Sequence, residues 1–273
     1  MNKGYVVQAT SEEELNFAEM LANSILSKNK NAKISLVTNQ SITDNNCFDQ
    51  IIEYPFYIKM PTRANDWQMY WASPYEYTML LDCKMIVSVD QESLWDYLID
   101  HYDVCIPTSF FDFRNQLTSY SKAHAYLEEY NMTTVFANML FFNKSENALR
   151  YFKLLDPIIQ NWEDSIMNFF APKDRVLDFD IDLIHSIVCS AIDFDVYPLH
   201  NNLFAYVDMN AVHKNNMLPD CAKWTDILST WHINNNIKIQ NYLTTHPLYY
   251  SDASFYTEQL ANDFRNYRNA ISK

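Results

Sequence analysis

The hydrophobic pattern of the first 55 residues alternates between strand-like and helix-like segments. Residues 5–8, 33–38 and 51–54 are short apolar runs, the pattern of buried strands. Between the first two runs, Ser11 is followed three residues later by Glu14, which is a capping-box spacing, and apolar residues then recur at helical intervals. This strand–helix–strand order predicts an α/β fold in which the strands pair in parallel.

The same kind of pattern continues along the rest of the chain. Further strands are predicted at residues 78–81, 103–107, 134–142 and 237–241, the last at a sheet edge, and apolar residues resume at 85–87. Further helices are predicted at residues 91–100, after residue 145, at 177–191 and from residue 254 onward. Residues 108–133 have no clear period and are predicted to form a long surface excursion. Because no repeat or linker interrupts the pattern, we expect one domain over residues 1–273, with residues 237–273 packed on it.

The composition excludes several classes of nucleotide-binding protein. The 273 residues are 48% hydrophobic, enough for a large core, yet Gly4 is the only glycine where average usage would give roughly 19. Phosphate-cradling loops need several glycines because their backbone must approach phosphate without a Cβ. The usual dinucleotide-binding folds, P-loop NTPases and protein kinases are therefore excluded. The 28 asparagines are expected to form turns in place of glycine, since asparagine tolerates the left-handed conformation.

Charge and cysteine content bear on partners and on the cellular setting. Asp and Glu number 34 against 20 Lys and Arg, a net charge of −14, so a generally basic nucleic-acid surface is excluded while a local basic groove stays open. The five widely spaced cysteines contain no C-x-x-C pair, which favours free thiols in a reducing cytoplasm over disulfides or structural zinc. We see neither a signal peptide nor a long apolar span, and we expect a cytoplasmic protein that does not enter membranes.

Asp82 and Lys84 are the first candidates for chemistry, because they directly follow the apolar run of residues 78–81. A carboxylate at the carboxyl end of a buried strand can hold a Mg²⁺ or Mn²⁺ ion or face a sugar diphosphate. The alternative is an ordinary turn in which Asp82 ends the strand and Lys84 is solvated. The spacing alone leaves both interpretations open.

Three further sets of residues admit both a functional and a structural interpretation. Asp178, Asp182 and His185 fall at i, i+4 and i+7 of a predicted helix. They form either a face for metal binding or acid–base chemistry, or the solvated side of an amphipathic helix. His246 follows a predicted strand and is either a ligand contact or a capped loop histidine. Five aromatic residues form either a wall for a base or sugar ring or ordinary packing: Trp67, Tyr70, Trp71, Tyr75 and Tyr77. A nucleophilic triad has no support, since there is no G-x-S-x-G sequence and no cysteine in a cationic setting.

Four segments, in order along the chain, combine into a familiar pattern: residues 4–38, 67–85, 136–143 and 178–183. The second contains Ser-Pro-Tyr-Glu-Tyr-Thr-Met-Leu-Leu-Asp-Cys-Lys, and the third is Phe-Ala-Asn-Met-Leu-Phe-Phe-Asn. Together they resemble nucleotide-sugar glycosyltransferases of the GT-A fold, particularly the family-8-like and virus-encoded members. In this resemblance the first segment holds the nucleoside, the second ends in the Asp-x-Asp motif, the third matches an Asn-Ser-Gly strand, and the fourth lines the acceptor side. A weaker likeness joins residues 237–246 to a C-terminal strand and loop whose histidine, in relatives, returns to the metal and diphosphate.

The resemblance implies a fold, an activity and a set of site residues. The fold is α/β, a single GT-A-like domain with a mixed, mainly parallel central sheet flanked by helices. The implied activity is that of a hexosyl- or pentosyltransferase, which moves a sugar from a nucleotide-diphosphate sugar to an acceptor hydroxyl, with Mn²⁺ or Mg²⁺ as the family's metal. The implied donor-binding residues are Gln8, Ala9, Thr10, Asp82, Lys84, Ala137, Asn138 and His246. The implied catalytic residues on the acceptor side are Asp178, Asp180 and Asp182, and Asp82 is the implied metal ligand.

The chain departs from the family's pattern at two positions. The last Asp of the Asp-x-Asp motif is Lys84 here, and the family's glycine beside the acceptor pocket corresponds to Asn138. We favour the interpretation that the Lys84 ammonium replaces the metal, which leaves Asp82 to hold a ribose hydroxyl or Lys84 itself. One alternative is a non-catalytic protein that binds a nucleotide sugar or a partner. The other is a transferase acting on hydroxymethylated bases of DNA, which the net charge of −14 opposes in the absence of a basic groove.

Overall fold

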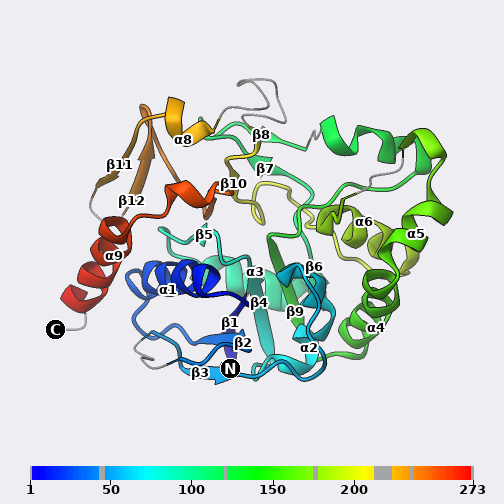
Figure 1. Cartoon of the computed structure of the whole chain (residues 1–273), viewed down its shortest axis with the longest axis horizontal. Helices are drawn as coiled ribbons and strands as arrows, with labels where there is room; N and C mark the ends of the chain where they lie inside the picture. Colours follow the sequence, from blue (N-terminus) through cyan, green and yellow to red (C-terminus); the bar gives the residue numbers. More distant parts are fainter. Residues whose placement is uncertain are drawn as a thin grey trace.

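The structure is a computed structural model that describes residues 2–42, 47–119, 122–174, 178–211, 223–233 and 236–271. Parts of several sequence predictions lie outside these residues: asparagines 45–46, 215–216 and 234–235, the first residue of the helix predicted at 177–191, and one of the five cysteines, Cys221. Figure 1 shows a central sheet with helices on both of its faces, and a group of short strands in the upper part of the view.

A six-stranded sheet forms the centre of the fold, in the strand order β3-β2-β1-β4-β9-β6. Its strands are β1 (Lys3–Ala9), β2 (Ile34–Thr38), β3 (Gln50–Ile52), β4 (Tyr77–Leu81), β6 (Val104–Cys105) and β9 (Met139–Asn143). β1 pairs in parallel with β2 and β4, and β2 with β3, whereas β9 runs antiparallel to β4 and β6. The predicted mixed, mainly parallel sheet is therefore confirmed. The strand predicted over residues 134–142 is shorter than expected, because its ladder begins only at Met139.

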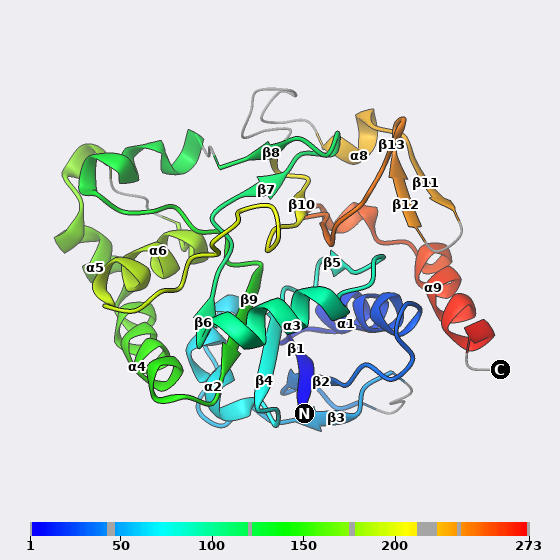
Figure 2. The ribbon, with the colours of Figure 1, turned by 180° about the vertical axis from the view of Figure 1, so that it is seen from behind.

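Helices cover both faces of this sheet because the strands alternate their side chains between two cores. The helices are α1 (Glu12–Leu26), α2 (Met69–Ala72), α3 (Glu92–His101), α4 (Glu146–Gln160), α5 (Trp162–Phe169) and α6 (Ile181–Ala191), with the 3₁₀ turns η1 (Thr62–Gln68) and η3 (Pro172–Asp174). Val7 and Met79 lie in the core that includes residues of α1 and α3. Val6 and Leu80, one position along each strand, lie in the core that includes residues of η1, α4 and α6. Figure 2 shows α4, α5 and α6 grouped at one side of the molecule.

A second, five-stranded sheet joins segments from the middle and the end of the chain. Its order is β5 (Met85–Ile86), β14 (Leu248–Tyr249), β10 (Val207–Asp208), β7 (Phe110–Phe111) and β8 (Leu117–Thr118). The prediction of a surface excursion at residues 108–133 is therefore wrong, because Phe110 and Phe111 are buried in this sheet and Leu127 on η2 (Lys122–Tyr130) is fully buried. Strands of two residues are too short to show the alternating period from which strands are recognised.

The C-terminal region contains a small antiparallel sheet and a helix. The elements are β11 (Thr230–Ile233), β12 (Asn236–Ile239), β13 (Tyr242–Leu243), α8 (Trp224–Ile227), η4 (Ala253–Phe255) and α9 (Glu258–Ile271). β12 pairs with both of its neighbours, so the edge position predicted for residues 237–241 is wrong. α9 packs along α1, where Arg265 Nη2 lies 2.6 Å from Glu19 Oε1.

The structure also provides observations on three expectations from the sequence: the conformation of asparagine in turns, the state of the cysteines, and membrane-spanning helices. Asn115 and Asn131 have φ values of 60° and 55°, the left-handed conformation that was predicted for asparagine. The buried Cys83, Cys105 and Cys189 carry free thiols. None of the described helices combines the length and the apolar character that a membrane span requires.

The single glycine of the chain lies where β1 passes closest to an aromatic ring. A Cβ on Gly4 would approach three ring carbons of Tyr75 to within 2.5–2.7 Å, closer than van der Waals contact permits. Tyr75 cannot easily move away, because it is buried and its hydroxyl hydrogen-bonds with Ser35 at 2.8 Å. Close approach of the ring, rather than an unusual φ, therefore accounts for glycine at this position.

We expect Gly4→Ala to lower the free energy of unfolding by about 1–3 kcal/mol, the usual cost of overpacking a core. Urea unfolding checks this value. The matched control is the same substitution in a Tyr75→Ala background, where the added methyl group meets no ring and its cost should largely disappear. An equal cost in both backgrounds would contradict the assignment.

Candidate active site

A polar cavity of about 210 Å³ opens at the carboxyl ends of β1 and β4. Its lining includes Gln8 from β1, Arg63 from η1, Asp82 and Lys84 directly after β4, and Tyr249 from β14. Neighbouring parallel strands end at the same edge of a sheet, which is where α/β proteins collect polar groups for ligands. Asp82 and Lys84 therefore line an opening at the sheet edge, as their position after a buried strand predicted.

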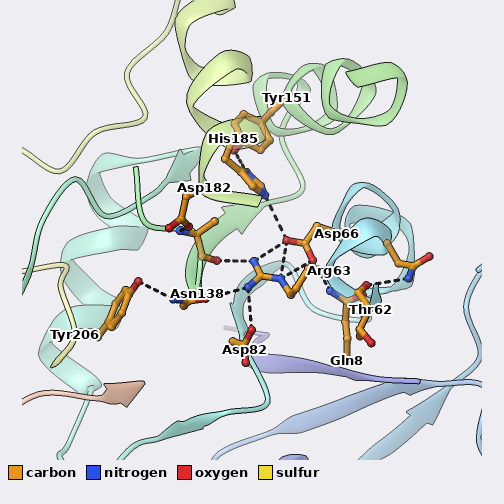
Figure 3. A network of polar contacts seen from close by, with 12 residues as sticks. Gln8, Thr62, Arg63, Asp66, Asp82, Asn138, Tyr151, Asp182, His185 and Tyr206 are labelled. Atoms are coloured by element: carbon orange, nitrogen blue, oxygen red, sulfur yellow. Dashed lines mark hydrogen bonds and ion pairs between the residues drawn. The ribbon is translucent and has the colours of Figure 1, made fainter. Parts of the chain in front are cut away.

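Arg63 lies at the centre of the polar network around this cavity (Figure 3). Its Nε lies 3.0 Å from both carboxylate oxygens of Asp66, and Nη2 donates to Asp66 Oδ2 at 2.7 Å and to the Ala137 carbonyl at 2.7 Å. Nη1 donates to Asp82 Oδ2 at 3.1 Å and to Asn138 Oδ1 at 3.3 Å. All five N–H groups of the guanidinium thus have acceptors within the protein.

Asp66 is the buried counter-charge of Arg63. Its side chain is fully buried, and besides Arg63 it accepts a hydrogen bond from Gln8 Nε2 at 2.7 Å. Burial opposes ionisation of this carboxyl, but the nearby Arg63 guanidinium and hydrogen bonds from His185 and Arg63 hold its pKa below the ordinary value of 3.8. Asp66 is therefore an ionised acceptor inside the protein.

Asp82 closes the end of β4 through its own side chain and backbone. Oδ1 accepts from the Lys84 backbone N–H at 2.8 Å, and the Asp82 N–H donates to the Asn138 carbonyl at 2.9 Å. Oδ2 takes the Arg63 contact, so each carboxylate oxygen already has a protein donor. The carboxylate of Asp82 consequently pairs with Arg63, and its contact with Lys84 is to the backbone and not to the ammonium.

Lys84 presents a different kind of cation to the cavity. Its ammonium lies 6.0 Å from the centre of the Phe17 ring. Among the described residues it has no carboxylate partner, in contrast to Arg63, which pairs with Asp66 and Asp82. Lys84 thus lines the cavity without being neutralised by a carboxylate of the described residues.

The side chains at this edge do not fit a divalent metal. Asp82 has both oxygens engaged, and the neighbouring position that could supply a second carboxylate is Lys84. Glu14 also lines the cavity, but its carboxylate accepts from Thr10 and Thr62 at 2.7–3.0 Å. Across the described chain, no group of three or more His, Cys, Asp and Glu residues is arranged to hold a metal ion.

Most residues predicted to bind the donor lie around this network, but His246 does not. Gln8 lines the cavity, Ala9 and Thr10 continue from it, and Asn138 Nδ2 donates to the Tyr206 hydroxyl at 2.9 Å. His246 is not part of the cavity lining and stacks on Phe111, with ring centres 4.0 Å apart. Burial lowers its pKa. None of the five aromatic residues considered as a ring-binding wall lines the cavity either.

The three acidic residues predicted for the acceptor side have different surroundings. α6 begins at Ile181 because Asp180 is its N-cap and accepts from the Leu183 N–H at 3.1 Å; Asp180 also contacts His124 Nε2 at 2.7 Å. Asp178 precedes the helix and is exposed, so the helical face predicted for residues 178, 182 and 185 does not form. Asp182 Oδ1 accepts from the Ala137 N–H at 2.7 Å, beside the carbonyl that Arg63 contacts.

Several residues of the network were not identified from the sequence. Arg63 and Asp66 lie within the aromatic, polar stretch before β4, and Tyr206 and Tyr249 lie on or beside short strands of the second sheet. The first pair does have a sequence signal: opposite charges three residues apart, with no other charged residue between Lys59 and Glu76. Nothing in the local sequence distinguishes the two tyrosines from the other 17.

The fold is similar to that of known glycosyltransferases. The galactosyltransferase LgtC, in complex with donor and acceptor sugar analogs, matches with a TM-score of 0.52 and 10% identity over 98% of this chain and 95% of LgtC. The glycosyltransferase GlyE of Streptococcus pneumoniae TIGR4 matches with a TM-score of 0.50 and 12% identity over 98% of this chain, which spans only 60% of GlyE. No family model and no curated protein matches the sequence. The chain thus has the GT-A fold that its sequence resemblance predicted.

Replacing Asp66 removes the buried counter-charge of Arg63. We expect Asp66→Asn to lower the free energy of unfolding by roughly 3 kcal/mol, because an uncompensated buried charge is costly. Chemical denaturation at neutral pH measures the effect. The control is Asp100→Asn on the exposed side of α3, which should change stability by less than about 0.5 kcal/mol. Similar values for the two variants would refute the role given to Asp66.

The lowered pKa of Asp66 also predicts how stability depends on pH. The folded state releases this proton more readily than the unfolded state, so the ion pair contributes fully above about pH 5 and its contribution is lost as the pH falls through 3.8 and below. The stability difference between the wild type and Asp66→Asn should therefore shrink from pH 6 towards pH 3. Unfolding curves for both proteins across this range test it, and a difference that stays constant would rule it out.

Proposed function

We propose that this protein is a glycosyltransferase that moves a sugar from a nucleotide-diphosphate sugar to an acceptor hydroxyl. The GT-A fold supports the proposal, as does the polar cavity at the carboxyl edge of the central sheet. In this proposal the nucleoside lies near residues 8–10, the diphosphate lies against Lys84, and the transferred sugar lies towards Ala137 and Asn138.

The observation that carries the proposal is the contrast between the two cations at the cavity. Arg63 gives every N–H to protein acceptors, whereas Lys84 has no carboxylate partner in the described part of the chain. An ammonium at about 4 Å from a phosphate charge contributes about 4 kcal/mol in partly screened surroundings. Lys84 is therefore our candidate for the group that holds the diphosphate without a metal.

The chemistry of transfer assigns distinct tasks to the two sides of the site. The bond between the anomeric carbon and the diphosphate oxygen breaks, a bond from the acceptor oxygen to that carbon forms, and the proton of the acceptor hydroxyl is released together with the diphosphate. Lys84 stabilises the negative charge that develops on the departing diphosphate. Asp182, which is anchored to the Ala137 N–H, is our candidate for the carboxylate that orients the acceptor, ahead of Asp180 and the exposed Asp178.

The balance of charges at the cavity makes Lys84 the main positive charge for a bound diphosphate. Three carboxylates lie in or directly beside the cavity, those of Glu14, Asp66 and Asp82, against the two cations Arg63 and Lys84. Without Lys84, a diphosphate would meet carboxylates and a guanidinium that is already neutralised. We therefore expect the affinity for the donor to depend more strongly on the Lys84 side chain than on the summed charge of the other groups at the cavity.

We expect Lys84→Ala to raise the KM for the donor, or the Kd for the nucleoside diphosphate, by about 10–100-fold, which corresponds to about 1.4–2.7 kcal/mol. The assay follows hydrolysis or transfer with a panel of nucleotide sugars, and calorimetry follows nucleotide binding. Lys153→Ala, an exposed lysine on α4, is the matched control and should leave both values unchanged. In the same assay EDTA should leave turnover intact, because Lys84 takes the place of the metal.

The outcomes separate the proposal from its alternative. Strict dependence on Mn²⁺ or Mg²⁺ would defeat the metal-independent version. Nucleotide-dependent thermal stabilisation without turnover of any donor would instead support the non-catalytic binder, which the missing second carboxylate at position 84 favours. Neither stabilisation nor turnover would defeat both.

A further inference from the structure

A chain of hydrogen bonds reaches the site from residues that are not part of the cavity lining. Tyr151 on α4 and His185 on α6 are fully buried, and the Tyr151 hydroxyl hydrogen-bonds with His185 Nδ1. The other ring nitrogen, Nε2, lies 3.3 Å from Oδ2 of Asp66. Asp66 in turn holds Arg63 (Figure 3). The sequence placed His185 with Asp178 and Asp182, but the structure turns it towards the buried carboxylate.

The carboxylate of Asp66 determines which group donates in the hydrogen bond between His185 and Asp66. Asp66 is an ionised acceptor, so Nε2 of His185 must carry the proton that lies between them. Burial raises the pKa of the Tyr151 hydroxyl well above its usual range, so this hydroxyl keeps its proton, and it hydrogen-bonds with both His185 Nδ1 and Cys189. The opposite tautomer would point two lone-pair-bearing atoms at each other across 3.3 Å.

The series of hydrogen bonds ends at Arg63, which contacts several residues around the cavity. Asp66 contacts Arg63, and Arg63 contacts both Asp82 and the Ala137 carbonyl. α6, which carries His185, also holds the Ala137 N–H through Asp182. α6 therefore contacts the surroundings of Arg63 twice. Asp182 binds the backbone of Ala137 directly, and His185 acts through Asp66.

We propose that His185 and Tyr151 are positioning residues of the donor site, which fix the Asp66 carboxylate and, through it, the Arg63 guanidinium beside Asp82. The kinetic consequence of this inference rests on the glycosyltransferase function proposed above. Hydrogen-bond partners that orient metal ligands typically change activity about 10–100-fold when they are removed, and we expect an effect of the same order for partners that orient the Asp66 carboxylate. The effect falls on kcat, because the network shapes the site for the reaction while Lys84 supplies the contact that binds the diphosphate.

The experiment compares His185→Phe, His185→Gln and Tyr151→Phe in the full chain. His185→Phe should lower kcat about 10–100-fold with the donor KM changed less than about 3-fold. His185→Gln should recover most of the loss, since its amide N–H can reach Asp66 in place of Nε2. Tyr151→Phe should fall between them. A His185→Phe enzyme that is less stable but has the wild-type kcat would overturn the proposal.

A matched control comes from the C-terminal sheet. His232 on β11 is nine-tenths buried and contacts Asp263 Oδ2 through Nδ1 at the same 3.3 Å, and neither residue lines the candidate active-site cavity. Because Asp263 is 40% exposed whereas Asp66 is fully buried, His232→Phe should lower the melting temperature less than His185→Phe does, while kcat and KM stay unchanged. Equal losses of kcat in both variants would show that general destabilisation, and not positioning, is responsible.

A spectroscopic readout keeps this inference separate from the proposed function. In protein with ¹⁵N-labelled histidine and arginine, the ring nitrogens of His185 should show the Nε2–H tautomer, and the Arg63 Nε–H resonance should shift in His185→Phe but not in His232→Phe. Both signals are independent of turnover, so they test the positioning role even if no sugar donor is ever transferred. An Nδ1–H tautomer, or an Arg63 signal unmoved by His185→Phe, would refute it.

Discussion

A guanidinium enclosed by protein is tolerated only when its charge is balanced and all of its N–H groups have acceptors, and Arg63 imposes both conditions on its surroundings. Its acceptors come from η1, from the end of β4 and from the turn before β9. Each segment must therefore lie in one particular place around the side chain. The polar edge of the central sheet is organised by this requirement more than by any single hydrophobic contact.

The same requirement divides the work between the two cations of the cavity. Arg63 is committed to Asp66 and Asp82, so it shapes the site and has no N–H left for a ligand. Asp82 is committed in return, and a divalent cation could use its carboxylate only by competing with the Arg63 ion pair. A lysine two residues later is consistent with this arrangement, because a flexible ammonium supplies positive charge without demanding coordinating oxygens from the protein.

α6 shows that helical spacing in a sequence does not by itself place residues on one face of a helix. Asp178, Asp182 and His185 have helical spacing, yet the helix starts only after the Asp180 cap, which leaves Asp178 outside. The remaining two take different tasks: Asp182 anchors the backbone of Ala137, and His185 supports the buried Asp66. Both contacts reach the surroundings of Arg63 from α6, Asp182 through the backbone of Ala137 and His185 through Asp66.

The sequence by itself determined the strand–helix–strand opening, the mainly parallel sheet, and the position of Asp82 and Lys84 at a strand end, because periodicity and capping are local signals. The tertiary structure alone decided that Asp82 pairs with Arg63, that His246 stacks on Phe111 away from the cavity, and that two-residue strands assemble a second sheet. The partners Asp66 and His185 are 119 residues apart in the chain. Contacts over such separations depend on how whole elements pack, and no local pattern of residues records that packing.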